Sequence, residues 1–182
     1  MGTIPALPLP DPPLAAPSIG LVLRPWGTHP GDAGALASAW SDPDIQRWCA
    51  VPIDRGTADA DRWMAGETRR RAEHGALDLV IADSLDPSRV QGEVGLLLVD
   101  PERGFAELGF WLLPSSRGRA LATTAVDLLS TWALATLPVR RLFARVAGEN
   151  RASVRVVEAA GYALVGHAAE GELEVWVRDG PA

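Results

Sequence analysis

The chain has 182 residues, of which 47% are hydrophobic and 22% charged, and its formal net charge at pH 7 is −6. This length suits a single domain, and the composition is that of a folded globular protein rather than a disordered or fibrous one. The acidic charge disfavours nucleic-acid binding, because a surface that binds a phosphate backbone is usually basic, and no apolar stretch is long enough to span a membrane.

Counts of individual residue types narrow the chemistry further. All 17 basic residues are arginine, so the lysine that a P-loop needs is missing. Cys49 is the only cysteine, which excludes an intrachain disulfide, and the three scattered histidines form no pair with metal-binding spacing. Because the N-terminus also has no basic region followed by an apolar one, we expect a cytoplasmic enzyme without a metal ion.

The chain begins with a proline-rich segment. Residues 1–17 carry six prolines and no periodic apolar pattern, and proline favours extended, weakly hydrogen-bonded chain. We therefore expect a flexible leader, with an ordered arm against a partner as the alternative. A single domain would then cover residues 18–182.

Apolar periodicity and turn residues predict the elements of this domain. Its first half has the pattern of a strand, helices and an antiparallel meander, at 19–26, 31–40, 43–49, 57–75, 77–83, 93–100 and 105–113. Thr57 is the expected N-cap of the longest of these helices. The second half predicts a helix, a strand, a helix and a hairpin, within 117–137, at 139–147, at 150–161 and at 162–179 with a turn near Glu170. This order is typical of a mixed α/β layer structure and not of an alternating Rossmann domain.

The turn that precedes the helix within 117–137 has the features of a phosphate site. Unpaired amides of residues around Arg119 to Ala122 would lie at the positive end of the helix dipole. Gly118 and Ala120 would let a diphosphate approach the backbone, and Arg117 and Arg119 would add charged hydrogen bonds. An ordinary capped turn explains the same residues, so both interpretations stay open.

A second group of polar residues surrounds the next helix. Asn150 is a good N-cap residue and Ser153 lies one helical turn further on, so their side chains either cap the helix or face a ligand. Tyr162 is the only tyrosine and follows the same helix. It either packs in an interface with its hydroxyl bonded or offers that hydroxyl to a reaction.

Taken in order, the runs AELGFWLLP, SRGRALATTA and NRASVRVVEAAGY resemble the GNAT acetyltransferase superfamily, most closely its ribosomal-protein N-terminal (RimJ/RimL-like) group. The resemblance covers roughly residues 19–178. It implies a central, mostly antiparallel sheet of about seven strands, with helices on both faces and a splay between the fourth and fifth strands. Those strands would be 105–113 and 139–147 here, and acetyl-CoA, the implied co-substrate, would lie in the opening.

The resemblance also implies which residues hold acetyl-CoA. The pantetheine would follow the end of the first splayed strand, the pyrophosphate would sit on the turn, and the sulfur would approach the next helix. The cofactor-binding residues implied in this way are Trp111, Leu112, Leu113, Arg117, Gly118, Arg119, Ala120, Leu121, Ala122, Asn150 and Ser153. Ala120 stands where the family usually has a glycine. A methyl group there is tolerated if φ is negative, whereas a required positive φ would weaken phosphate binding.

For the reaction, the resemblance implies direct attack of a primary amine on the thioester. Cys49 lies away from the cofactor motifs, which argues against an acetyl-enzyme. A base is needed because the amine arrives as ammonium, and Glu107, on the strand that borders the cleft, is the first candidate. Glu172 on the last hairpin is the second, and a water chain is an alternative to both. Ser153 or Tyr162 would protonate the leaving thiolate.

The acceptor is left open by the sequence. The first hypothesis is the α-amine of a protein or peptide N-terminus, and the second is a small-molecule amine such as an antibiotic or a polyamine. The third, of another class, is a catalytically idle acyl-CoA-binding or interaction module. We expect the acceptor site within 26–75 and the last hairpin, where tryptophans that either line a groove or pack in a core are concentrated, namely Trp26, Trp40, Trp48 and Trp63. A homodimer is expected, and nucleic-acid or membrane partners are not.

Overall fold

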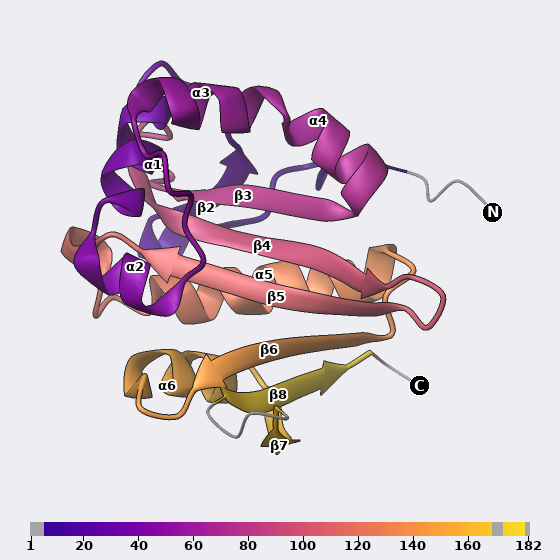
Figure 1. Cartoon of the computed structure of the whole chain (residues 1–182). Helices are drawn as coiled ribbons and strands as arrows, with labels where there is room; N and C mark the ends of the chain where they lie inside the picture. Colours follow the sequence, from indigo (N-terminus) through magenta and orange to yellow (C-terminus); the bar gives the residue numbers. More distant parts are fainter. Residues whose placement is uncertain (1–5, 169–172, 181–182) are drawn as a thin grey trace.

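The computed structural model describes residues 6–168 and 173–180 (Figure 1). Its strands form one open sheet in the order β1-β2-β3-β4-β5-β6-β8-β7. Neighbouring strands are antiparallel except β5 and β6, which are parallel. The bounds are Ala15–Ala16 (β1), Leu21–Pro25 (β2), Ala76–Ala82 (β3), Val90–Asp100 (β4), Phe105–Leu112 (β5), Arg141–Ala147 (β6), Ala163–His167 (β7) and Leu173–Asp179 (β8).

The helices cover the two faces of the sheet unequally. Helices α5 and α6 pack on one face of the sheet, whereas α1 and α3 pack on the other face, mainly over β2 and β3 (Figure 1). Alternation along β3 shows this division, because Leu79 and Ile81 belong to the larger core and Val80 to the smaller one. The helices are Asp32–Trp40 (α1), Pro43–Trp48 (α2), Thr57–Ala65 (α3), Glu67–Arg69 (α4), Leu121–Thr136 (α5) and Arg151–Ala159 (α6).

The unequal cover leaves one face of β4, β5 and β6 open. Leu97 and Val99 point from β4 to this face, and their side chains are 45% and 53% exposed. Within the part of the chain that the structure describes, α2 lies over this face only at the end of β5 in Figure 1. The open face is therefore where a second molecule can approach the sheet.

The expected splay is confirmed. β5 and β6 pair only at their first residues, from Phe105 opposite Arg141 to Glu107 opposite Phe143. Beyond that point both strands continue without a register pair, to Leu112 and Ala147. The strands therefore separate towards their carboxyl ends and open the sheet there.

Most expected elements are confirmed, including the antiparallel meander of β3, β4 and β5. Asp42 is the N-cap of α2, and its side chain accepts hydrogen bonds from the amides of Asp44 and Ile45. The described residues form one strand more than the seven expected, because Ala15–Ala16 adds a short edge strand, β1, to β2. The expected turn near Glu170 lies outside the described residues.

Two local expectations are wrong. Thr57 is the first residue of α3, and its N-cap is Gly56, whose amide donates to Asp59. The long helix expected at 57–75 is interrupted at Gly66, after which come α4 and a π-helical turn, Arg70–His74. Glycine favours such a break, because it is among the weakest helix formers.

The proline-rich segment packs against the domain over its described residues. Leu7 is only 2% exposed and belongs to the larger core. Its amide donates to the carbonyl of Arg71, and its own carbonyl accepts from the Arg71 guanidinium at 2.6 Å. Residues 6–17 are therefore an arm bound to their own domain, a third arrangement beside the leader and the partner arm considered above.

Candidate active site

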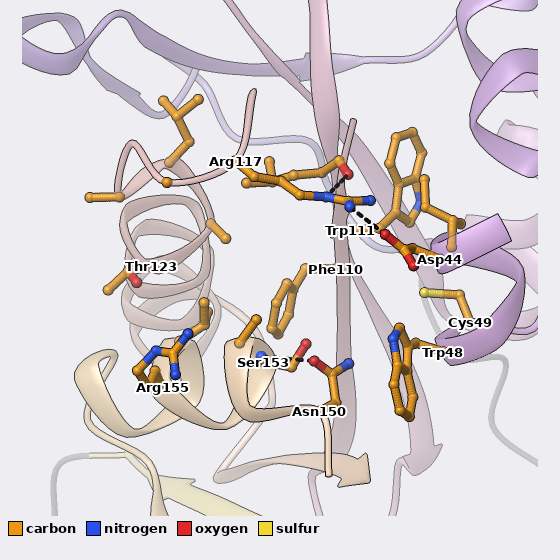
Figure 2. Close-up of a pocket in the computed structure, with 18 residues that line it drawn as sticks. Asp44, Trp48, Cys49, Phe110, Trp111, Arg117, Thr123, Asn150, Ser153 and Arg155 are labelled. Carbon is orange, nitrogen blue, oxygen red and sulfur yellow. Dashed lines mark hydrogen bonds and ion pairs between the residues drawn. The ribbon is translucent and has the colours of Figure 1, made fainter. Parts of the chain in front are cut away.

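The separation of β5 from β6 creates a cavity of about 440 Å³. Its walls come from β5, from the first turns of α5 and α6, and from α2, which closes the side opposite α5 (Figure 2). Phe110 lies between these walls, with Trp48 on the α2 side and Thr123 on the α5 side. Of the expected cofactor residues, nine line this cavity: Trp111, Leu112, Arg117, Gly118, Ala120, Leu121, Ala122, Asn150 and Ser153.

The N-terminus of α5 has free amides and an unusual backbone. Ala120 is the N-cap, has φ 57° and ψ 6°, and provides no side-chain hydrogen bond to the helix. The amides of the first turn therefore keep their donors for a ligand, as a phosphate site requires. The left-handed conformation costs an L-residue such as alanine roughly 1–2 kcal/mol. The positive φ that the sequence left as one of two alternatives is thus the one observed. Its strain is present with and without a ligand, so it does not by itself weaken phosphate binding in the way the sequence suggested.

Arg117 binds α2 in this structure. Its Nη1 lies 2.7 Å from Asp44 and its Nη2 lies 3.4 Å from Asp42 (Figure 2). Its Nε also donates to the carbonyl of Leu112 at 3.3 Å. These bonds hold α2 over the cavity, so a phosphate would compete with two carboxylates for this guanidinium.

Another arginine was missed by the sequence analysis. Arg155, on α6, lines the cavity near Thr123 of α5 (Figure 2). Arg119 and Leu113, which were expected to bind the cofactor, do not line it. The signal for Arg155 was its place on the helix that Asn150 caps, but helical spacing alone did not indicate that this face meets α5.

Asn150 combines the two interpretations that its sequence position allowed. Its Oδ1 accepts a hydrogen bond from the amide of Ser153 at 3.2 Å, so it caps α6. Both side chains also line the cavity between α5 and α2. Capping therefore fixes the Asn150 side chain at the wall of the cavity rather than removing it from the site.

A second, larger cavity of about 1370 Å³ lies on the open face of the sheet. It meets the smaller cavity at residues that line both: Trp48, Cys49, Phe110, Trp111, Asn150 and Ser153. The junction lies where β5 leaves β6. A ligand in the smaller cavity and another in the larger one would therefore meet there.

Glu93, on β4, was missed as a candidate and lines the larger cavity. It is opposite Trp111 in the register of β4 and β5. One carboxylate oxygen accepts from the indole of Trp26 at 2.7 Å, and the other accepts from the indole of Trp111 at 3.0 Å. Burial, and then the charge of Asp78, raise the pKa of Glu93 to about 8, although the two indole bonds act in the opposite direction.

The expected base Glu107 also lines the larger cavity but has a charged partner. Both of its oxygens accept from the Arg145 guanidinium, each at 2.9 Å. The hydrogen bonds to Glu107 and its charge raise the pKa of Arg145. Because this pair joins β5 to β6 where they begin to separate, Glu107 is a clamp between the strands. Glu172, the second expected base, lies outside the described residues.

Tyr162 does not reach either cavity, which is contrary to its expected role as an acid. It is 4% exposed, and its hydroxyl is 2.8 Å from that of Ser130 on α5. Burial raises its pKa to about 12. The packing interpretation is the correct one, and Ser153 is the remaining candidate acid.

Cys49 lies at the junction of the two cavities, contrary to its expected distance from the cofactor motifs. Helix α2 carries it there when it docks on Arg117. Burial and the charge of Glu93 raise the pKa of the thiol to about 11. Since the thiolate is the nucleophilic form, Cys49 is a poor nucleophile at neutral pH. What argues against an acetyl-enzyme is therefore the raised pKa of this thiol and not its distance from the cofactor motifs.

The tryptophans serve the core and the larger cavity together. Trp26 and Trp40 are buried in the smaller core, and Trp63 meets both of their rings edge-on at 6.5 and 6.1 Å. Trp40, Trp48, Trp63 and Trp111 also line the larger cavity. The Arg70 guanidinium stacks on Trp63 at 3.8 Å and reaches Asp78, 3.5 Å away, so this wall also carries charge.

Comparison with known proteins identifies the family. The model of the acetyltransferase (GNAT) domain matches residues 20–163. The chain belongs to the GNAT acetyltransferase family. It is 24% identical over 133 residues to the uncharacterized N-acetyltransferase p20 of Bacillus licheniformis, over 72% of this chain and 73% of that protein. As a GNAT member it is an acetyl-CoA-dependent N-acetyltransferase.

Solved structures show the same fold at low sequence identity. RimL, a ribosomal L7/L12 α-N-protein acetyltransferase in complex with coenzyme A, has a TM-score of 0.75 at 17% identity, over 92% of this chain and 97% of that one. Spermidine N-acetyltransferase from Vibrio cholerae, in complex with CoA and spermine, has a TM-score of 0.70 at 18% identity, over 87% and 93%. These GNAT relatives differ in acceptor, so the fold alone does not assign one.

None of the helices in the described part of the chain is long and apolar enough to cross a membrane. In the same part of the chain, no group of three or more histidine, cysteine, aspartate or glutamate side chains is placed to hold a metal ion.

Proposed function

We propose that this GNAT acetyltransferase acetylates the α-amine of a peptide or protein N-terminus by direct attack on the thioester of acetyl-CoA. The observation that supports the proposal is the junction of the two cavities, with Glu93 on the wall of the larger one. A cofactor and a chain-like acceptor would meet there from opposite sides.

The smaller cavity fits acetyl-CoA, which would supply the acetyl thioester. The free amides at the start of α5 would hold the diphosphate, together with Arg117 and Arg155, and Asn150 and Ser153 would lie beside the pantetheine. Arg117 would have to exchange its bonds to Asp42 and Asp44 for bonds to phosphate. We therefore propose the expected cofactor residues that line this cavity, together with Arg155, as the acetyl-CoA site.

The larger cavity suits a peptide better than a small amine. Its volume of about 1370 Å³ exceeds the 300–1,000 Å³ or so that is usual for small-molecule pockets, and it opens on the uncovered face of the sheet. Its charges are also mixed, because three arginines of its lining each pair with an acid, as Arg47–Glu149, Arg70–Asp78 and Arg145–Glu107. Glu93 and Glu174 are two further acids of the lining, so its charge suits any ammonium, and the choice of a peptide rests on the size of the cavity and on its opening to the sheet face.

Glu93 is the proposed base. The indoles of Trp26 and Trp111 each bond one carboxylate oxygen and fix its orientation, and the remaining lone pairs can accept a proton from the acceptor ammonium. A pKa of about 8 matches that of an α-amine, about 7.7–8.0, so the transfer is nearly balanced. Ser153 is the proposed donor of a proton or hydrogen bond to the leaving sulfur.

The test measures thiol release from acetyl-CoA against a panel of amines. We expect turnover with short peptides that have a free N-terminus and none with the same peptides blocked at that amine. A blocked peptide that contains lysine is the matched control for side-chain acceptors. Spermidine is the control for polyamine acceptors. Turnover only with spermidine or other small amines would replace the proposal by the small-molecule alternative. Binding of acetyl-CoA without turnover of any amine would favour the idle module.

Two further expectations accompany the proposal. A homodimer and a cytoplasmic location stay predictions. Light scattering after size exclusion measures the first, and fractionation of the source cells measures the second.

A further inference from the structure

Gly109 stands in the middle of β5 without a reason in the fold. It is not one of the glycines with positive φ. A Cβ built on it would meet no atom within 4 Å, so packing does not require a glycine there either. Glycine in the interior of a strand weakens the strand, and it often marks a place where a ligand approaches the backbone closely.

Two neighbouring glycines show the contrast. A Cβ on Gly92 would lie 2.3 Å from the carbonyl oxygen of Trp111, and one on Gly95 would lie 2.9 Å from a carboxylate oxygen of Asp78. Both positions are closed to larger residues by the protein itself. Gly109 is open, so contacts within the described protein do not account for the glycine there.

The place of Gly109 in the site indicates what would approach it. It lies opposite Gly95 in the register of β4 and β5, between the pair Glu93–Trp111 and the pair Leu97–Glu107. It lines the larger cavity, two residues beyond Glu107, the last residue of β5 that pairs with β6. The two glycines form a floor without side chains beside Glu93 and in front of the splay.

We propose that Gly109 is a specificity-determining position of the acceptor site, where the amine-bearing carbon and the first residue of an extended peptide N-terminus lie flat on the sheet. This inference rests on the proposed function. The amine then faces Glu93, and the rest of the peptide follows the cavity along the open face. A side chain at position 109 occupies the space of the acceptor and leaves the acetyl-CoA cavity unchanged, because Gly109 does not line that cavity.

The test is a graded series, Gly109→Ala and Gly109→Val, with Ala163→Val as the matched control. Ala163 is an exposed residue of β7 that lines neither cavity, so its substitution places the same valine side chain on a strand outside the site. We expect kcat/KM for a peptide acceptor to fall progressively, by about 10²-fold in Gly109→Val, because a displacement of about 1 Å at the reacting centre has an effect of that size. Coenzyme A affinity should stay within threefold or so of the wild type.

Folding is checked in the same series. Valine favours strands and finds open space at position 109, so the unfolding midpoint of Gly109→Val should equal or exceed that of the wild type. A loss of activity with that midpoint and with coenzyme A binding retained supports the inference. Unchanged kcat/KM in Gly109→Val overturns it, and so does an equal loss in Ala163→Val.

The outcomes separate this inference from the proposed function. If the wild type acetylates amines but no peptide, the proposed function fails, and the series is measured on the amine that is used. A graded loss on that amine still assigns Gly109 to the acceptor site, and an unchanged rate overturns the assignment. If the wild type acetylates no amine, both proposals fail.

Discussion

Ala120 offers a direct measurement of backbone strain at the cofactor turn. With φ at 57°, the alanine pays roughly 1–2 kcal/mol for a left-handed conformation that glycine adopts freely. Glycine also gains freedom in the unfolded chain, which offsets about 0.4–1 kcal/mol of that difference. We therefore expect Ala120→Gly to stabilise the protein by about 0.5–1 kcal/mol. In a chain of 182 residues this raises the Tm by about 1–4 °C.

The reverse substitution provides the control. Gly118, two residues earlier, has φ 74°, and a Cβ there would meet nothing within 4 Å. Gly118→Ala therefore introduces the same strain without a clash and should lower the Tm by a similar amount. Differential scanning calorimetry of the wild type and both variants measures the two shifts. An unchanged or lower Tm in Ala120→Gly, beside the expected loss in Gly118→Ala, would refute the reasoning.

The affinity for coenzyme A distinguishes backbone strain at Ala120 from obstruction of the phosphate by its methyl group. The strain of Ala120 is present with and without ligand, so it drops out of the binding free energy. We expect Ala120→Gly to change the coenzyme A Kd by less than about threefold. A much larger gain in affinity would mean that the methyl group itself obstructs the phosphate.

The remaining predictions concern the proton groups. Glu93→Gln should lower kcat by about 10²–10⁴-fold. In the wild type, kcat/KM should fall below about pH 8 as Glu93 is protonated, and this fall should be absent in the variant. If the variant shows the same fall, the titrating group is the acceptor amine and not Glu93. Because the pKa of Glu93 is raised in the folded protein, its protonated carboxyl group favours the folded state. This contribution to stability is complete below the ordinary pKa of 4.5 and is lost as the pH rises through about 8. Denaturant unfolding at several pH values should therefore show the wild type losing stability relative to Glu93→Gln across that range. Tyr162→Phe should cost about 1–3 kcal/mol of stability through the lost bond to Ser130 and leave kcat within about threefold of the wild type. Ser153→Ala, in contrast, should lower kcat. A large loss of kcat in Tyr162→Phe would contradict the packing role of Tyr162.

The fold was largely accessible from the sequence because its signals are local. Alternation in β3 and β5, the proline after Asp42 and the glycines at helix ends each act within a few residues. The break at Gly66 shows the limit of such signals. Good helix formers stand on both sides of Gly66, so the sequence predicts one continuous helix. The structure instead has α4 and a π-helical turn after Gly66.

The candidate site was less accessible, because its chemistry depends on burial and on pairing between distant segments. The proposed cofactor turn could be singled out as a candidate because its small residues and arginines lie together in the sequence, and several of them line the smaller cavity. Cys49 was misplaced because the bond that brings α2 to the turn joins Asp44 to Arg117, and no local pattern shows it. Arg155 was missed for a similar reason, since the sequence does not show that its face of α6 meets α5.

Glu93 and Glu107 also show that the sequence alone does not reveal the environment of a side chain. They lie on neighbouring strands and both line the larger cavity, so alternation alone treats them as equivalent. The structure gives Glu107 a guanidinium on both oxygens, whereas it surrounds Glu93 with indoles and raises its pKa. Both oxygens of Glu107 are thus already engaged by one guanidinium, which leaves this carboxylate tied to β6. The environments therefore distinguish the two acids, with Glu107 joining the strands where they part and Glu93 as the proposed base.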